Sequence, residues 1–208
     1  MTVSIPIMIA VEDSLSGAVV EKLLRESRRP YQVGKRLGQT GCEYLRRNIR
    51  GFNNAAQGIP YLVLTDLDQA ECPPVLIRQW LPISAHPNLL FRVAVREVET
   101  WLLADQEALA KFLGIKTALI PDDVEVLPDP KRFLISLAKR SRYRELREDI
   151  VPPEGSTSKV GPDYNGRLIR FVNDHWDLVA AGRRSASLAS ASEAVRRFKP
   201  RWSKTQES

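Results

Sequence analysis

The sequence predicts an α/β protein with a parallel sheet flanked by helices, for two reasons. Short apolar runs typical of strands alternate four times with helix-like segments in the first 115 residues, as in parallel sheets with helical crossovers. The chain has 208 residues, 43% hydrophobic and 27% charged, which suits a globular protein with one substantial core.

The first strand–helix pairs lie before residue 57. The run "IPIMIAV" predicts a strand, and "EDSLSGAVVEKLLRES" predicts a helix that Ser14 can cap. The run "YQVGKRL" is a weaker strand signal, and "GCEYLRRNIRGFNNAA" indicates the second helix. These elements supply the first half of the expected sheet and its first two crossovers.

The third and fourth strands are expected between residues 59 and 95. Residues 59–67 are rich in branched side chains, and the run is continuous enough that we expect a strand covered on both faces. The segment "PPVLIRQWLPI" predicts a short helix opened by proline, and "NLLFRVAV" the fourth strand. The following "REVETWLLADQEALAKFLGI" predicts helix that is recapped at Asp105 and ended by Gly114.

The remainder of the chain predicts helices. We expect them in "DPKRFLISLAKRS", near residues 141–149 and near residues 164–179, with the loop "VPPEGSTSKVGPDYNG" in between. The end of the chain is Ser- and Ala-rich and then basic, compatible with a final helix and a disordered tail. We therefore predict an α/β domain at 1–115 and a mostly helical extension packed on it at 116–208.

Cysteine and histidine provide no signal for a soft-metal site. Cys42 and Cys72 are far apart, and neither His86 nor His175 has the spacing of a zinc ligand. Any metal is therefore expected to be a hard cation bound by oxygen. The N-terminal segment lacks a secretory n-region and no apolar run approaches a membrane span, so we expect a cytoplasmic protein without a membrane partner.

Acidic residues follow three of the predicted strands, at the edge where open parallel sheets bind ligands. They are Glu12 and Asp13, Asp66 and Asp68, and Glu97 and Glu99. On an extended segment positions 66 and 68 project to one side. Two such carboxylates repel each other unless a cation, a shared proton or water relieves the repulsion. A divalent ion, Mg²⁺ or Mn²⁺, would hold the acidic residues ionised in one crevice, and a plain turn is the alternative.

The acidic segments "IAVEDS" and "VLTDLDQ" resemble the TOPRIM domain, the metal-binding fold of topoisomerases, primases and the OLD nucleases. The segment "RVAVREVETWLLAD", with the later "DPK" and "GPDYN", resembles more narrowly a bacterial TOPRIM-like family that is often encoded beside AAA-type ATPases. The TOPRIM-like part covers about residues 3–105, and the narrower likeness extends to about 190. The predicted fold is therefore TOPRIM-like, with a Rossmann-like parallel sheet.

The resemblance implies a Mg²⁺-dependent nuclease or effector that cleaves phosphodiester bonds, linked to phage defence. Asp66 and Asp68 would hold one ion, while Glu12 would hold or bridge to another or act as general base. Asp13 could share the role of Glu12. Glu97 and Glu99 are further candidate metal ligands. No Walker loop is present, so any ATP hydrolysis would come from a partner AAA-type ATPase.

Basic residues are the remaining candidates, on a chain with a net charge of +6. Lys159 is a candidate catalytic residue that could meet charge developing on a phosphate, or it is a solvated loop residue. Lys131 in "DPK" is ambiguous in the same way, with a helix-surface role favoured. We predict nucleic-acid binding by the basic side chains towards the end of the chain, namely Arg183, Arg184, Arg196, Arg197, Lys199 and Arg201. A solvated, solubilising surface explains the same charges equally well.

Other functions stay open at this point. The chain could be a non-catalytic partner or regulatory subunit of an ATPase, its acidic residues kept for a structural ion or for docking. An activity on a smaller phosphorylated substrate would use the same chemistry. A homo-oligomer is compatible with the sequence, which does not separate DNA from RNA or one ion from two.

Overall fold

The computed structural model describes residues 4–202 and divides the chain into two compact units. The first unit comprises the chain up to Val93 together with the segment from Ala191 onward, and the second is Ala94–Ser190. These junctions do not coincide with the predicted boundary at 115/116. The last residues of the basic tail, 203–208, lie outside the described residues.

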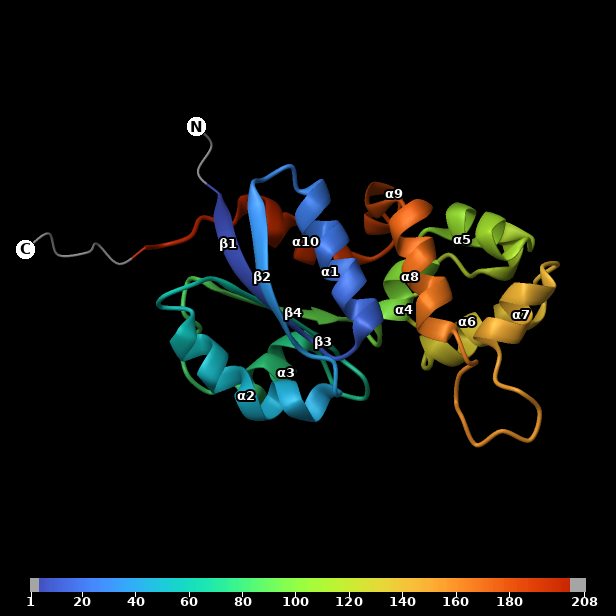
Figure 1. Ribbon diagram of the computed structural model, residues 1–208, viewed down its shortest axis with the longest axis horizontal. Coiled ribbons are helices and arrows are strands. Elements are labelled where there is room, and N and C mark those ends of the chain that lie inside the picture. Colours follow the sequence, from blue (N-terminus) through green and yellow to red (C-terminus); the bar gives the residue numbers. More distant parts are fainter. Residues whose placement is uncertain (1–3, 203–208) are drawn as a thin grey trace, which may run out of the picture. The chain divides into compact units, whose positions relative to one another are not determined.

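The first unit contains a four-stranded sheet in the order β2-β1-β3-β4 (Figure 1). Its central strand β1 pairs in parallel with β2 on one side and with β3 on the other. The predicted α/β class, a parallel sheet flanked by helices, is confirmed. The strands are β1 (Ile5–Val11), β2 (Tyr31–Gly38), β3 (Tyr61–Asp66) and β4 (Leu89–Ala94).

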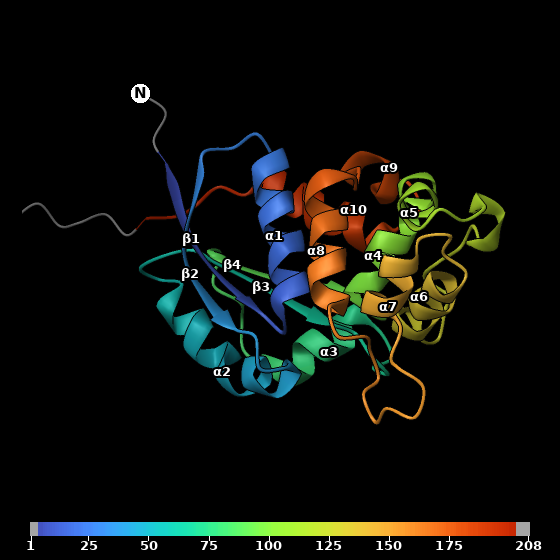
Figure 2. The same ribbon diagram turned by 45° about the vertical axis from the view of Figure 1, so that its right-hand side comes forward.

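Helices cover both faces of this sheet (Figures 1 and 2), with α1 on one side and α2 and α3 on the other. Ile7, Ile9 and Val11 of β1 are fully buried, as expected for a central strand with two covered faces. The helices are α1 (Ser14–Glu26), α2 (Cys42–Ala55) and α3 (Pro73–Trp80).

The segment after the second unit returns to the first one. Helix α10 (Ala186–Arg197) contains the junction between the units. In its C-terminal part the Val195 carbonyl accepts a hydrogen bond from the Tyr31 hydroxyl at 2.6 Å. Beyond the helix, the backbone N–H of Arg201 donates to Asn88 Oδ1 at 2.7 Å. The first unit is therefore built from residues that lie on both sides of the second in the sequence.

The second unit is helical. Its core contains Trp101 and Trp176, which are 0% and 2% exposed. The Trp176 indole donates to the Trp101 carbonyl, and the Trp101 indole donates to Ser187 Oγ at 2.7 Å. The elements are α4 (Val98–Ala104), α5 (Gln106–Leu113), η1 (Thr117–Leu119), α6 (Pro130–Lys139), α7 (Arg144–Ile150), α8 (Tyr164–Asp174) and α9 (Leu178–Gly182).

Helix ends agree with the sequence in some places and differ in others. Asp105 ends α4 and caps α5 by accepting from the Ala108 N–H, and Gly114 ends α5 with a φ of 65°, both as predicted. The cap predicted at Ser14 is wrong by one residue, because Asp13 accepts the Ser16 N–H at 2.8 Å. The helix expected at 164–179 is divided, because Asp177 caps the separate helix α9.

None of the helices in residues 4–202 combines the length and the apolar character that crossing a membrane requires.

Candidate functional site

Two adjacent strands of the first unit end in acidic residues. The strands β1 and β3 are parallel, with Val11 beside Leu64, so their carboxyl ends lie at the same edge of the sheet. The next residues along the two strands are Glu12 and Thr65, followed on β3 by Asp66. The register therefore places Glu12 against the end of β3, as the sequence predicted for the ligand-binding edge.

Glu12 is held against β3 by two hydrogen bonds. Its Oε1 accepts from Thr65 Oγ1 and from the Asp66 backbone N–H, the latter at 2.9 Å. Within the described part of the chain Oε2 accepts no hydrogen bond. The carboxylate is thus fixed in place through one oxygen, while the other remains available to a ligand or a proton.

The surroundings make Glu12 a weaker acid than usual. Burial raises the pKa of Glu12, the hydrogen bonds from Thr65 and Asp66 oppose that rise, and the negative charges of Asp68 and Asp13 add to it. Three carboxylates of this unit therefore lie within electrostatic reach of one another. Repulsion of this kind is relieved by a cation or by a proton.

Asp68 occupies a turn beyond the end of its strand. Strand β3 ends at Asp66, and Asp68 has a φ of 48°, in the left-handed region that non-glycine residues seldom adopt. The expectation that residues 66 and 68 project together from one extended segment is therefore wrong. A turn brings the Asp68 charge towards Glu12, and local strain of this kind is common at functional sites.

Cys42 borders the same acidic group from the start of α2. Burial raises the pKa of the Cys42 thiol, and the charges of Glu12 and Asp68 raise it further. The thiol is therefore expected to stay protonated at neutral pH, which makes it a poor metal ligand. The potential ligands of this group that remain are oxygens.

Oxygen ligands suit Mg²⁺, which often binds through one or two carboxylates and keeps several water molecules. In residues 4–202 no group of three or more histidine, cysteine, aspartate or glutamate residues is arranged so that it could hold one ion. The residues present therefore fit an ion bound by one or two carboxylates and completed by water or a substrate phosphate. They do not fit an all-protein cage.

The second unit contains a separate buried cluster around Glu99. Glu99 is 1% exposed, and its Oε1 accepts from the Tyr164 hydroxyl at 2.8 Å and lies 3.5 Å from Lys131 Nζ. Glu97 accepts the Lys131 backbone N–H at 2.8 Å, near the start of α6. Burial raises the pKa of Glu99, and the Lys131 ammonium opposes that rise. The motifs "REVET", "DPK" and "GPDYN" thus converge on one cluster.

The predicted site residues are divided between the units. Glu12, Asp66 and Asp68 belong to the first unit, whereas Glu97, Glu99 and the exposed Lys159, on the loop between α7 and α8, belong to the second. The roles of Glu97 and Glu99 as metal ligands and of Lys159 as a catalytic residue stay predictions.

The basic residues predicted to bind nucleic acid are also divided between the two units. Arg183 and Arg184 belong to the second unit and the other four to the first. Arg196 and Arg197 both pair with Glu193, which partly neutralises them. Their binding role stays a prediction.

Sequence reasoning missed Thr65 and Tyr164, which hold Glu12 and Glu99. A hydroxyl residue directly before the first aspartate of "TDLD" was a signal for Thr65, and the quoted "GPDYN" already contained Tyr164. Neither pattern states which carboxylate the hydroxyl contacts, because the partners lie 53 and 65 positions away.

Among solved structures, the chain is similar to the C-terminal region of the Burkholderia pseudomallei OLD protein. The two share 18% identity with a TM-score of 0.44, over 91% of this chain and 96% of that one. No family model and no curated protein matches.

Proposed function

We propose that this protein is a Mg²⁺-dependent enzyme that cleaves phosphodiester bonds in nucleic acid. The observation that carries the proposal is the environment of Glu12. Its carboxylate is fixed by Thr65 and Asp66 at the carboxyl ends of two parallel strands, and burial, with a smaller contribution from the charges of Asp68 and Asp13, raises its pKa. Acidic residues set against one another in this way favour binding of a divalent cation.

Each residue has a distinct part in the proposed reaction. Asp66 and Asp68 would hold Mg²⁺ or Mn²⁺, which when bound lowers the pKa of water and offsets charge on the phosphate. Glu12 would accept a proton at Oε2, because its raised pKa brings it closer to neutral pH, where a general base works best. Thr65 and the Asp66 N–H orient that carboxylate through Oε1. A role in phage defence with an ATPase partner remains part of the proposal.

A cleavage assay with matched variants tests the proposal. Purified protein is incubated with labelled single- and double-stranded DNA and RNA, in Mg²⁺, Mn²⁺ or EDTA. We expect metal-dependent cleavage that Asp66→Asn abolishes. Asp122→Asn changes charge equally at an exposed position of the other unit and is expected to cleave like the wild type. Equal cleavage by Asp66→Asn and wild type would overturn the assigned site.

Binding of the ion is measured separately from cleavage. We expect Mg²⁺ to raise the melting temperature of the wild type and not that of Asp66→Asn, because a ligand that binds only the folded state stabilises it. Stabilisation by Mg²⁺ without cleavage of any substrate would support the alternative of a non-catalytic partner with a structural ion.

A further inference from the structure

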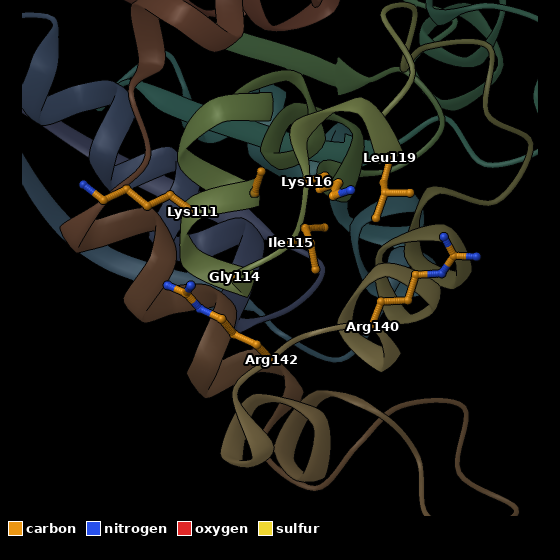
Figure 3. A pocket seen from close by; sticks show the side chains of 8 residues that line it. Lys111, Gly114, Ile115, Lys116, Leu119, Arg140 and Arg142 are labelled. Atoms are coloured by element: carbon orange, nitrogen blue, oxygen red, sulfur yellow. The ribbon is translucent and has the colours of Figure 1, made fainter.

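A cationic cavity lies within the second unit, and none of the residues assigned above lines it. It measures about 540 Å³ and is formed at the C-terminal end of α5, around η1 and at the turn between α6 and α7. Figure 3 shows Lys111 and Arg142 on one side of Ile115, and Lys116 and Arg140 on the other. No acidic residue lines this cavity.

The four basic side chains are not neutralised within the protein. All four residues are exposed, and in residues 4–202 none of them forms an ion pair with an acidic residue. Nearby arginines differ, since Arg144 pairs with Glu148 at 2.7 Å and Arg167 with Asp149 at 2.6 Å. Four uncompensated cations around one hollow repel each other, and a bound polyanion would relieve that repulsion.

The backbone shapes this cavity around one arginine. Gly114 has a φ of 65°, and a Cβ at this position would lie 2.6 Å from Arg142 Cγ and 2.7 Å from a Tyr143 ring carbon. The absent side chain lets Arg142 and Tyr143 lie directly against the end of α5. The Arg142 guanidinium also stands 4.8 Å from the centroid of the Tyr143 ring and donates to its hydroxyl, so its position is fixed.

A second cavity, of about 630 Å³, shares Lys111 and Arg142 with the first. Its lining differs in kind, because it includes the rings of Phe112, Tyr143 and His175, together with a single acidic residue, Asp174. Tyr143 is 41% exposed, so part of its side chain is accessible to a ligand. Aromatic faces next to uncompensated cations are the combination that binds an unpaired base and its adjacent phosphates.

We propose that these two adjoining cavities bind a single-stranded nucleic acid, with backbone phosphates at Lys111, Lys116, Arg140 and Arg142 and a base against Tyr143. The inference rests on the proposed function in taking nucleic acid as the substrate class, and it assigns a binding surface outside the cleavage site. A duplex does not satisfy both cavities, because its bases are stacked and paired and are not available to Tyr143.

Equilibrium binding without cleavage tests this surface. The full chain carrying Asp66→Asn is titrated in EDTA into a fluorescently labelled single-stranded oligonucleotide, over a series of salt concentrations. The test variant adds Lys111→Gln, Lys116→Gln and Arg140→Gln. The control adds Arg132→Gln, Arg144→Gln and Arg170→Gln, exposed residues of the same unit that line neither cavity. Both lose the same charge, and circular dichroism verifies that both are folded.

The expected effect follows from counterion release. Each phosphate contact contributes about 0.7 to the slope of log K against log salt for a single strand, so three lost contacts lower the slope by about 2. At about 0.1 M salt this corresponds to a loss of affinity of about 100-fold, with a much smaller loss in the control. Equal losses in the two variants would overturn the site and leave only general attraction by net charge.

The base contact has its own test. Tyr143→Ser is expected to weaken binding of the normal oligonucleotide about tenfold more than binding of an abasic oligonucleotide of the same length, because loss of stacking affects only the former, whereas loss of the Tyr143 contact to Arg142 affects both. Equal weakening for both ligands would overturn the assignment of the base to Tyr143. The outcome is separable from the proposed function, because binding is measured in EDTA and cleavage depends on Asp66. Binding that is lost in the test variant and kept in the control supports this surface even if no cleavage is observed.

Discussion

Replacing Thr65 by valine isolates the hydrogen bond that fixes Glu12. Thr65 is 1% exposed, and its hydroxyl donates to Glu12 Oε1. Valine has nearly the same shape but no donor, so the carboxylate keeps only the Asp66 N–H. A hydrogen bond to a charged group contributes about 1.5–3 kcal/mol. We therefore expect Thr65→Val to lower the free energy of unfolding at neutral pH by about 2 kcal/mol.

The loss should depend on pH because the bond is strongest to the ionised carboxylate. Below the ordinary glutamate pKa of 4.5, Glu12 is protonated in both the folded and the unfolded state, and a neutral hydrogen bond contributes only about 0.5–1.5 kcal/mol. Thr65→Val should therefore cost less at pH 4 than at pH 7.5.

Scanning calorimetry at the two pH values measures this difference. A loss of about 2 kcal/mol corresponds to a fall in melting temperature of about 4–8 °C for a chain of this size. Thr157→Val, at an exposed loop position, is the control and is expected to melt like the wild type. An equal loss at both pH values, or no loss at all, would refute the assignment of Thr65 as the donor to an ionised Glu12.

Three further outcomes follow from the contacts described. Glu12→Gln should flatten the pH dependence of stability. Burial raises the pKa of Glu12 in the folded state, so the free energy of unfolding of the wild type falls as pH rises from 4.5 through that pKa. Urea titrations at several pH values in which the variant keeps the wild-type dependence of stability on pH would contradict this. Tyr164→Phe removes the 2.8 Å hydrogen bond to buried Glu99 and should cost about 1.5–3 kcal/mol in chemical denaturation, whereas an unchanged midpoint would show that the hydroxyl does not hold Glu99. Gly38→Ala should destabilise by at least about 1–3 kcal/mol, because Gly38 has a φ of 89° and a Cβ would lie 2.2 Å from the Val11 carbonyl oxygen; its control Gly51→Ala, in open space on α2, should stabilise by about 0.5–1 kcal/mol, and the same sign for both would refute the steric argument.

The elements that the sequence predicted well are those that local chemistry determines. The recapping at Asp105 and the end of α5 at Gly114 were predictable because a short polar side chain and a residue without Cβ act within a few positions of the chain. The cap at Asp13 was missed because Asp13 and Ser14 are both good N-caps and adjacent. Propensity alone does not choose between them.

The features that the sequence did not predict depend on contacts between distant residues. Buried Glu99 contacts Lys131 and Tyr164, and no spacing rule links residues so far apart. The boundary at 115/116 was placed where the strand–helix alternation ends, whereas the structure divides the chain after Val93. That Glu12 and Asp66 lie at the same edge of the sheet was predictable, because neighbouring parallel strands place their carboxyl ends together.

The return of the chain to the first unit affects the order of events during synthesis. The hydrogen bonds from Tyr31 to Val195 and from Arg201 to Asn88 join segments made early to segments made after the whole of the second unit. During synthesis the first unit therefore cannot form these contacts until residues 195–201 have been made, and the intervening helices emerge and have time to fold before then. A chain interrupted within that interval would present to chaperones and proteases a first unit that has its four strands but lacks the segment from Ala191 onward.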